Sequence, residues 1–394
     1  MPLTLISILW IILQVLIGYH LVMPVLMYIA HLLFIRHKTL PQALKESDYG
    51  IIVTAYEQTN TLPAVVRSLL QLNYSNYMIY IVADKCDVSD LHFNDERVVV
   101  LRPPETLASN TRSHFYAIHR FVRAHDRLTI IDSDNLAHPD YLKELDVFFN
   151  NGFRAVQGVR MAKNLNTTYA CLDAARDIYY HYYDGKILFE LGSSATLAGS
   201  GMAFETALYR ECLEHNDVTG AGFDKVLQAA IVKKNIQIAF AEKALVYDEK
   251  TSESAQLVNQ RARWINTWFK YFGYGFSILG YGLKNMSRNQ LLFGLVLLRP
   301  PLFIFLILSG LFLFINIWLS VSAVIIWAVA LLLFVAGFGI ALALSHTDKR
   351  IYRSLVNIPK FMFFQVLSLL RARTANKRSV ATTHYHSSEI EDIS

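Results

Sequence analysis

Two aspartates separated by one residue follow a short apolar run, and this arrangement could bind a metal ion. Asp132-Ser133-Asp134 comes directly after Leu128-Thr129-Ile130-Ile131, whose β-branched and apolar residues predict a buried strand. Side chains alternate along a strand, so the carboxylates at positions i and i+2 point to the same side. At the carboxyl end of a parallel sheet, such a pair suits Mg²⁺ or Mn²⁺ bound to a diphosphate. The same residues also suit an ordinary polar turn.

The strand before these aspartates belongs to a series in which predicted strands and helices alternate. Such alternation predicts a mostly parallel, Rossmann-like α/β sheet with a nucleotide-type site at the carboxyl edge of its strands. Neither a G-x-G-x-x-G motif nor a Walker loop occurs, which argues against dinucleotide and P-loop chemistry. The predicted strands cover residues 49–55, 77–82, 97–101 and 128–131, and the predicted helices cover residues 62–72, 110–124 and 139–149.

Three later segments contain further candidate residues. The glycine pair in Gly199-Ser200-Gly201 would allow the backbone to approach a ligand closely, and a plain turn is an equal alternative. Asp224 is expected at the start of a helix, where a single aspartate is most often an N-cap. Gln260-Arg261-Ala262-Arg263-Trp264 combines guanidinium groups, which bind phosphate well, with an aromatic ring on which a sugar can stack.

The composition indicates a membrane protein with a soluble middle. The chain is 53% apolar and only 18% charged, which is unusual for a soluble protein. Residues 3–35 and 300–345 contain no charged side chain. We expect residues 1–36 to form one membrane-spanning helix, bent near Pro24, and residues 300–346 to form a hairpin of two spanning helices.

The distribution of basic residues predicts the orientation of the chain in the membrane. The positive-inside rule places the middle of the chain and its C-terminal tail in the cytoplasm, as an integral protein of the cell (inner) membrane. The net charge of +5 is better explained by anionic lipid head groups than by nucleic acid, for which no motif is present. Three widely spaced cysteines predict neither a disulfide nor a zinc site. The basic residues that flank the predicted spans are Arg36, Lys38, Lys284, Arg288, Arg299, Lys349, Arg350 and Arg353.

The remaining parts of the chain are a soluble domain and two segments expected at the membrane interface. The soluble domain covers residues 48–263. Residues 264–299 are rich in aromatic side chains but too polar to span a bilayer, and residues 347–394 contain an amphipathic helix followed by a basic cytoplasmic tail. For both interfacial helices, the alternative is packing on the core of the domain. His384 and His386 in the tail are expected to be solvated rather than to reach a metal.

The order of these motifs resembles that of the membrane-integrated family-2 glycosyltransferases, which include cellulose, chitin, hyaluronan and poly-N-acetylglucosamine synthases. The resemblance covers about Asp48 to Trp264, and its most specific motif is Q-x-x-R-W. It implies a GT-A fold that transfers a sugar from a UDP-sugar with inversion of configuration. The matching residues are Val53-Thr54-Ala55-Tyr56 in the first nucleotide-binding strand, Asp84 at a uracil-binding position, Asp132 and Asp134 in D-x-D, Asp224 as the base, and Gln260, Arg263 and Trp264 in Q-x-x-R-W.

The resemblance also implies a role for each matching residue. Asp134, aided by Asp132, would hold Mg²⁺ or Mn²⁺ on the leaving diphosphate. Asp224 would take the proton from the acceptor hydroxyl. We expect Ala55, Tyr56, Asp84, Asp132 and Arg263 to bind the nucleotide sugar, and Gly201, Gln260 and Trp264 to bind the acceptor.

Three positions depart from the pattern of this family. Phe223 replaces the acidic residue that usually precedes the base, and Glu57-Gln58 replaces the usual Asn-Glu after the first strand. Leu107 stands where a lysine often lies near a nucleotide phosphate, and Arg112 is a candidate substitute. These departures affect the donor and the diphosphate contacts, while the metal, base and acceptor positions are intact.

We therefore expect an enzyme whose partners are a UDP-sugar, a saccharide or lipid acceptor, and membrane lipids, but not nucleic acid. One hypothesis is elongation of a β-linked polysaccharide. Three predicted spans are few for a polysaccharide channel, so export would need a homo-oligomer or a partner subunit. A second hypothesis is single-step glycosylation of a membrane lipid, by analogy with relatives that resemble ceramide glucosyltransferase. A third is a degenerate transferase that serves as a scaffold.

Overall fold

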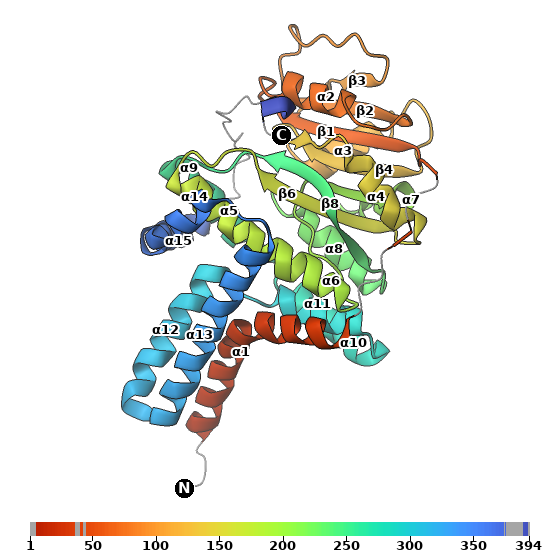
Figure 1. Ribbon diagram of the computed structural model, residues 1–394. Coiled ribbons are helices and arrows are strands. Elements are labelled where there is room, and N and C mark those ends of the chain that lie inside the picture. Colours follow the sequence, from red (N-terminus) through yellow and green to blue (C-terminus); the bar gives the residue numbers. More distant parts are fainter. Residues whose placement is uncertain (1–4, 36–39, 42–44, 374, 376–388, 393–394) are drawn as a thin grey trace.

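The computed structural model describes residues 5–35, 40–41, 45–373, 375 and 389–392. An α/β half carries a group of long apolar helices on one side (Figure 1). The central sheet has eight strands in the order β3-β2-β1-β4-β7-β6-β8-β5. Most neighbours are parallel, but β7 is antiparallel to both β4 and β6, and β5 is antiparallel to β8. The strands are β1 (Tyr49–Tyr56), β2 (Tyr77–Asp84), β3 (Val98–Leu101), β4 (Arg127–Asp132), β5 (Leu136–Ala137), β6 (Ala155–Ala162), β7 (Met202–Glu205) and β8 (Ile238–Asp248).

Two apolar cores lie on opposite faces of the sheet. Along β1 and β4, Ile52 and Ile130 belong to one core, whereas Ile51, Val53 and Ile131 belong to the other. This period of two is expected for strands that are covered by helices on both faces. The first core also contains side chains of α12 and α13, so the α/β half and the apolar helices share one continuous interior.

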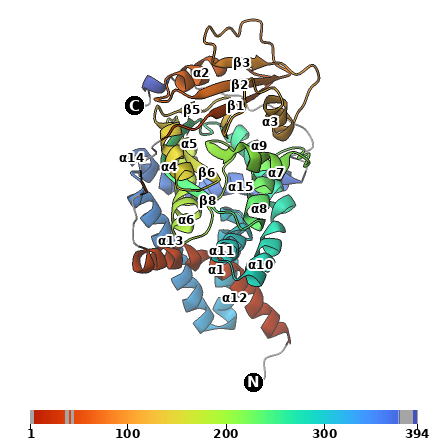
Figure 2. The ribbon, with the colours of Figure 1, turned by 90° about the vertical axis from the view of Figure 1, so that its right-hand side faces the viewer.

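In chain order, α1 precedes the sheet, α2 to α8 alternate with its strands, and α9 to α15 follow the last strand, β8. The helices are α1 (Leu5–Phe34), α2 (Leu62–Leu70), α3 (Asn110–Ile118), α4 (Tyr141–Asn150), α5 (Thr168–Tyr180), the π-helix η1 (His181–Ile187), α6 (Leu188–Glu190), α7 (Thr206–Leu213), α8 (Phe223–Lys233), α9 (Ser254–Tyr271), α10 (Tyr274–Asn285), α11 (Arg288–Leu297), α12 (Leu302–Leu319), α13 (Val321–Leu344), α14 (Lys349–Ser354), the 3₁₀ turn η2 (Leu355–Asn357), α15 (Ile358–Ala372) and the 3₁₀ turn η3 (Ile390–Asp392). Figure 2 shows α10 and α11 between α8 and the bent α1.

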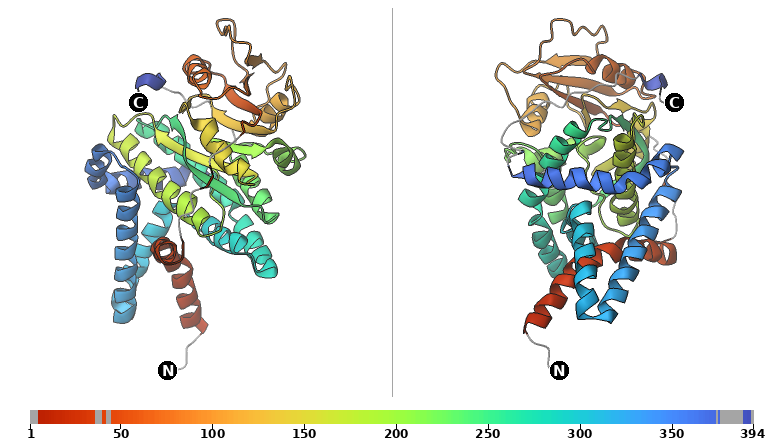
Figure 3. Two further views of the ribbon diagram at one scale, coloured as in Figure 1. Left: turned by 45° about the vertical axis from the view of Figure 1, so that its right-hand side comes forward. Right: turned by 90° about the vertical axis from the view of Figure 1, so that its left-hand side faces the viewer.

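Within the described ranges, four helical stretches are long and apolar enough to cross a membrane. Three of them, α1, α12 and α13, coincide with the spans predicted from the sequence. The fourth joins α14 to α15 and was expected only to lie at the interface. It is interrupted by η2, and α15 extends across the ends of α12 and α13, where it packs against α9 (Figure 3).

The helix α1 is bent, so that one half runs beside α12 and α13 and the other lies under the α/β half (Figure 1). Pro24 lies inside this helix, where its ring removes a backbone hydrogen bond and clashes with the preceding turn.

The side chain of Gln14 connects α1 to the hairpin, because its Oε1 accepts hydrogen bonds from Asn316 Nδ2 at 2.6 Å and Trp327 Nε1 at 2.7 Å.

The mostly parallel α/β fold predicted from the sequence is confirmed. The predicted strands and helices of the first hundred domain residues all occur, although α3 ends at Ile118 instead of continuing to residue 124. One placement is wrong. The Q-x-x-R-W motif lies in the middle of α9 and not at a helix end, so the predicted boundary after residue 263 falls inside one continuous helix. No glycine or proline interrupts residues 254–271, and the change from polar to aromatic residues does not end a helix.

Candidate active site

The ends of three neighbouring parallel strands bring predicted residues together. In the β1–β2 pair Tyr56 lies opposite Asp84, and in the β1–β4 pair Thr54 lies opposite Asp132. Because the strands are parallel, their carboxyl ends meet at one edge of the sheet. The residues that the sequence places after separate strands are therefore neighbours in the fold.

A cavity of about 340 Å³, which we call the donor cavity, opens at this edge. Its wall contains every residue that we expected to bind the nucleotide sugar, together with Asp134 and Gln260. The sequence did not point to other members of the wall, which include Asn110, Arg160 and Thr251. The predicted residues in the wall are Ala55, Tyr56, Asp84, Asp132, Asp134, Gln260 and Arg263.

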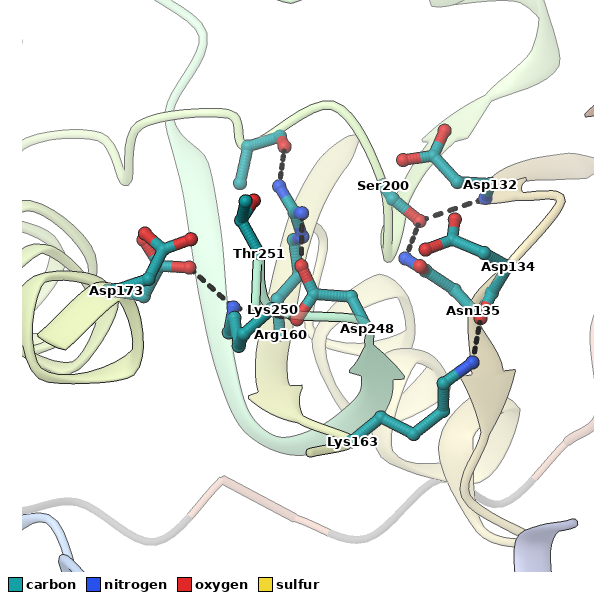
Figure 4. A network of polar contacts seen from close by, with 12 residues as sticks. Asp132, Asp134, Asn135, Arg160, Lys163, Asp173, Ser200, Asp248, Lys250 and Thr251 are labelled. Atoms are coloured by element: carbon teal, nitrogen blue, oxygen red, sulfur yellow. Dashed lines mark hydrogen bonds and ion pairs between the residues drawn. The ribbon is translucent and has the colours of Figure 1, made fainter. Parts of the chain in front are cut away.

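The D-x-D turn is held in place by Ser200, which comes from the glycine-rich segment before β7. Ser200 Oγ accepts one hydrogen bond from the backbone N–H of Asp132 at 3.0 Å and another from Asn135 Nδ2 at 2.7 Å. Lys163 Nζ donates to the carbonyl oxygen of Asp134 at 3.0 Å. These contacts, seen in Figure 4, fix the backbone of the turn and leave its orientation independent of any ligand.

The two carboxylates of the turn fit a divalent cation that also binds a diphosphate. Both line the donor cavity, and Asp134 is only 8% exposed. Among the described residues no group of three or more acidic, histidine or cysteine side chains could hold a metal by itself. Mg²⁺ commonly takes one or two carboxylates and completes its shell with water and substrate phosphates, so this donor set suits such an ion and not a closed structural site.

Asp84 shapes the wall of the donor cavity from a buried position. It is 2% exposed, and its two carboxylate oxygens accept hydrogen bonds from the backbone N–H groups of Leu107 at 2.9 Å and Ala108 at 2.7 Å. Ala108 has a φ of +45°, a conformation that a residue with a side chain adopts at a cost. The carboxylate therefore stabilises a strained loop that forms part of the cavity wall.

Two of the three departures from the family pattern, at Glu57 and Leu107, lie next to Asp84, whereas Phe223 begins α8. Glu57 forms an exposed ion pair with Lys85 at 2.7 Å. Arg112, the candidate substitute for a phosphate-binding lysine, forms an ion pair with Asp217 at 2.5 Å and lies outside the donor cavity wall. The Arg112 guanidinium therefore pairs with Asp217 instead of lining the donor cavity.

A second and much larger cavity, of about 1240 Å³, continues from the donor cavity toward the apolar helices, and we call it the acceptor cavity. Asp224 and Trp264 lie in its wall. Farther along, the wall consists of side chains from the hairpin and from α15. The residues shared by the walls of both cavities are Asn110, Asp132, Arg160, Ala221, Gln260 and Arg263.

Asp224 lies in the first turn of α8, on the acceptor side of this junction. The N-cap is Gly222 and not Asp224, so the alternative of a simple N-cap is wrong. Gly222 has a φ of +106°, and a Cβ there would lie only 2.6 Å from Thr267 Cγ2 of α9. The glycine thus brings the start of α8 against α9. The N-terminal end of the helix dipole favours a negatively charged carboxylate at Asp224, which Lys225 Nζ contacts at 3.0 Å.

The Q-x-x-R-W residues face both cavities from α9. Gln260 Oε1 accepts a hydrogen bond from Thr251 Oγ1 at 2.9 Å. Burial lowers the pKa of Arg263, although a guanidinium remains charged at neutral pH. Trp264 is 38% exposed, and the guanidinium carbons of Arg176 and Arg261 lie 4.4 Å and 4.1 Å from its ring centroid. These cation–π contacts position the indole in the wall of the acceptor cavity.

A chain of buried charged residues connects the walls of the two cavities (Figure 4). Arg160 pairs with Asp248 and donates to the carbonyl oxygen of Ala198 at 2.7 Å. Lys250 Nζ, whose side chain is 2% exposed, contacts Asp248 Oδ1 at 2.6 Å and Asp177 Oδ2 at 2.5 Å. Burial alone would lower the pKa of Lys250, but Asp177 and Asp248 raise it above its ordinary value. Lys250 is therefore a fixed positive charge between β8 and α5.

This charged chain continues from α5 to α9. Arg176 pairs with Asp177 and contacts Asp173 at 3.2 Å, and Asp173 pairs with Arg261. The sequence did not point to these residues, apart from Arg261, which lies within the Q-x-x-R-W segment. A usable signal was the arginine at position 160, because a single charged side chain in the otherwise uncharged strand 155–162 requires a partner if it is buried.

The expected place of Gly201 in the acceptor site is not met, whereas the expectation for the tail histidines stays a prediction. Gly201 lies outside the walls of both cavities, and its backbone N–H donates to Ile130 O at 2.9 Å within the sheet. Gly199 lines the acceptor cavity instead. The tail residues His384 and His386 lie outside the described residues.

Comparison with protein families decides the class of enzyme to which this site belongs. The model of the family described as "Glycosyltransferase like family 2" matches residues 47–267, which is more than half of the chain. This chain belongs to that family. It is a glycosyltransferase, and the matched region contains all the residues of the two cavities that come from the sheet.

Two solved structures are similar to this chain, and the first of them supports the fold. A mannosyltransferase, PcManGT from Pyrobaculum calidifontis, in complex with GDP-Man and Mn²⁺, is similar with a TM-score of 0.56 and 14% identity, over 91% of this chain and 98% of that one. TarS residues 1–349 from S. aureus matches with a TM-score of 0.40 and 15% identity over 84% of this chain and 90% of that one. No curated protein matches this chain in sequence.

Proposed function

We propose that this glycosyltransferase moves one sugar, with inversion, from a nucleoside-diphosphate sugar to a hydroxyl of a membrane lipid. A UDP-sugar is the proposed donor, because Asp84 matches a uracil-binding position of the family. Mg²⁺ or Mn²⁺ is the proposed cofactor. The α/β half lies on the cytoplasmic face of the membrane, where such donors are found, as the basic residues that flank the spans predict.

The observation that carries this proposal is the composition of the acceptor cavity. Near Asp224 its wall is polar and charged, but between the hairpin and α15 it is made of apolar side chains. A polar head and an apolar tail in one molecule would satisfy both parts. The apolar residues of this second part include Leu302, Phe303, Leu306, Leu331, Phe334, Val335, Phe338, Leu342, Phe361 and Met362.

The geometry supports different roles for the two cavities, with the leaving diphosphate in the donor cavity and the attacking hydroxyl in the acceptor cavity. Asp132 and Asp134 are placed to hold a cation that neutralises the charge growing on the leaving diphosphate. Arg263, in the wall of both cavities, supplies a guanidinium to the same diphosphate or to the sugar between the cavities. The diphosphate leaves with the electron pair of the bond to the anomeric carbon.

Asp224 is the proposed base. Its carboxylate takes the proton from the acceptor hydroxyl as the oxygen forms its bond to the anomeric carbon. The carboxylate lies in the first turn of α8, beside Lys225. One in-line attack inverts the configuration, so an α-linked donor gives a β-glycoside. Trp264 offers its ring to the sugar or head group beside the attack site.

The acceptor cavity gives less support to the other hypotheses. A growing polysaccharide needs polar groups along its path, whereas the continuation of this cavity between the hairpin and α15 is mostly apolar. A scaffold without activity would not need a carboxylate held at a helix start beside a cation site. Both remain distinguishable from lipid glycosylation by the product.

The experiment is a transfer assay with the full chain in nanodiscs that contain a total membrane lipid extract. Radiolabelled UDP-glucose, UDP-N-acetylglucosamine and GDP-mannose are each supplied with Mn²⁺, and the products are partitioned between organic and aqueous phases. We expect label in the organic phase, loss of transfer on addition of EDTA, and addition of one sugar mass to a lipid. Label in an aqueous polymer, or no transfer from any donor, would overturn the proposal.

A further inference from the structure

Gln228 lies one helical turn after Asp224 on α8, and both residues line the acceptor cavity. Residues at positions i and i+4 project from the same face of a helix, with their Cβ atoms about 6 Å apart. Gln228 is 0% exposed to solvent. It belongs to none of the sequence motifs that marked the site.

The orientation of the Gln228 amide follows from one contact. Leu197 N donates a hydrogen bond to Gln228 Oε1 at 2.9 Å, and only the oxygen end of the amide can accept it. The nitrogen end, Nε2, is a buried donor that has no hydrogen-bond partner within the described part of the chain. Buried amide groups nearly always find a partner, so this nitrogen is expected to have one when the cavity is filled.

Among the other buried polar atoms of the acceptor cavity wall that have no hydrogen-bond partner, donors outnumber acceptors. Arg160 Nε, Arg261 Nε and Nη1, and Trp268 Nε1 are also buried and unpartnered among the described residues, and all are donors. The exception is Asp184 Oδ1, whose carboxylate already pairs with Arg299 through its other oxygen. A wall with spare donors and few spare acceptors selects a head group rich in oxygen atoms that accept hydrogen bonds.

We propose that Gln228 is an acceptor-binding residue, whose Nε2 donates a hydrogen bond to an oxygen next to the hydroxyl that Asp224 deprotonates. This inference rests on the proposed lipid acceptor and specifies its head group. The head group carries at least one further oxygen beside the attacked hydroxyl, as a glycerol or a sugar does. An acceptor with a lone hydroxyl leaves Nε2 unpaired and binds less well.

The test compares two probes that share a tail, 1-O-dodecylglycerol and 1-dodecanol. Their binding to the full chain in nanodiscs is followed by tryptophan fluorescence, to which Trp264 and Trp268 of the cavity wall contribute. Each variant is compared with wild type, so that differences in partitioning into the bilayer cancel. The wild type is expected to prefer dodecylglycerol beyond its partitioning by about fivefold, the effect of one hydrogen bond.

Two substitutions separate the binding role of Gln228 from a structural one. Gln228→Met removes both ends of the amide, whereas Gln228→Glu keeps an oxygen that can accept from Leu197 N but removes the free donor. Both are expected to abolish the preference for dodecylglycerol and to leave dodecanol binding within about twofold of wild type. Gln290→Met is the matched control. Gln290 is equally buried, donates to Val232 O at 3.0 Å and Lys233 O at 3.1 Å, and lies outside both cavity walls.

The possible results separate this inference from the proposed function. A preference that survives in both Gln228 variants, or that is absent in the wild type, overturns the role of Gln228 and leaves lipid glycosylation standing. Loss of the preference in Gln290→Met as well would also overturn it, because a general loss of packing would then explain the effect. Failure of the wild type to bind either probe contradicts the lipid acceptor and this inference together.

Discussion

The donor cavity and the acceptor cavity are built in different ways. The donor cavity lies at the edge of a parallel sheet, and its main residues follow three strands whose order is set by the fold. The acceptor cavity is lined by side chains from helices that are far apart in the sequence, from α5 to α15. The two share only a few residues, including Asp132 and Arg263. Because the two walls come from different elements, substitutions in the helices of the acceptor cavity can change the acceptor without changing the residues that bind the donor.

The largest expected effect that separates the two cavities comes from the substitution Asp224→Asn, which alters only the wall of the acceptor cavity. A general base contributes about 10²–10⁴ to the rate, so kcat is expected to fall by that factor. Binding of the nucleotide sugar, measured by calorimetry, should be unchanged because Asp224 lies outside the donor cavity wall.

The matched control for the base is Asp217→Asn. Asp217 also lies near the start of α8, but it forms an exposed ion pair with Arg112 and lines neither cavity. The control should retain nearly full activity. If both variants were equally inactive, or if Asp224→Asn kept full turnover, the assignment of the base would be wrong.

The buried charged residues that connect the two cavities should contribute mainly to the stability of the fold. Lys250→Met leaves Asp177 and Asp248 without their shared cation, and breaking a buried ion pair costs about 3–5 kcal/mol. The comparison variant is Lys234→Met, which breaks an exposed pair with Glu211 and should cost at most about 1 kcal/mol. Thermal or denaturant unfolding of the detergent-solubilised protein measures both. Similar losses in the two variants would contradict a structural role for the buried network.

The apolar part of the acceptor cavity can be shortened at a glycine whose Cβ position is open. Gly339 of α13 lines this cavity, and a Cβ at this position would meet no atom within 4 Å. Gly339→Leu should lower transfer to long-tailed acceptors by about tenfold, because a side chain in the cavity displaces part of the tail and its buried area. Transfer to a short-tailed acceptor and donor binding should not change.

Gly310→Leu controls for the change in a membrane helix itself. Gly310 lies on α12 in equally open space but outside the wall of the acceptor cavity. Activity measured over acceptors of increasing chain length should be the same in this variant as in wild type. Loss of activity for all lengths in Gly339→Leu would point to a disturbed hairpin and not to an occupied cavity.

The last prediction concerns the dependence of stability on pH. Burial lowers the pKa of His114 to about 3, and this side chain contacts Tyr209 OH at 2.7 Å and the ring of Phe223 beside the base. Below pH 6.5 the unfolded chain takes up a proton that the folded chain excludes, so stability falls as the pH drops toward 3, by about 1.4 kcal/mol per unit. His114→Gln should flatten this dependence in unfolding curves. Equal slopes in wild type and His114→Gln would contradict the prediction.

Much of the donor cavity could be predicted from the sequence because strands carry a clear local pattern. Asp132 follows a run of β-branched residues, and residues at the ends of parallel strands meet wherever the strands are neighbours. The position of Asp84 could be predicted in this way, but its two hydrogen bonds to the backbone of residues 107 and 108 could not, because that loop has no local pattern.

The acceptor cavity could not be predicted in the same way. Gln228 and Gly339 are ordinary residues of their helices, and only the packing of α8, α9 and the hairpin places them in one wall. The end of α9 was also predicted wrongly, because its polar first half and its aromatic second half form one helix. Gly201 was expected in the site from its conformational freedom, yet it serves the sheet, and its neighbour Ser200 supports the D-x-D turn instead.

The central claim is that a lipid tail occupies the acceptor cavity, and cross-linking tests it most directly. A hydroxyl lipid with a diazirine in its tail is irradiated with the full chain in nanodiscs, and labelled peptides are sequenced. The account predicts labelling of Leu331 and Phe338, which line the cavity, and loss of this labelling in the presence of excess unlabelled lipid. Labelling only at Ile326 and Leu332, which are exposed and lie outside the cavity wall, would contradict it.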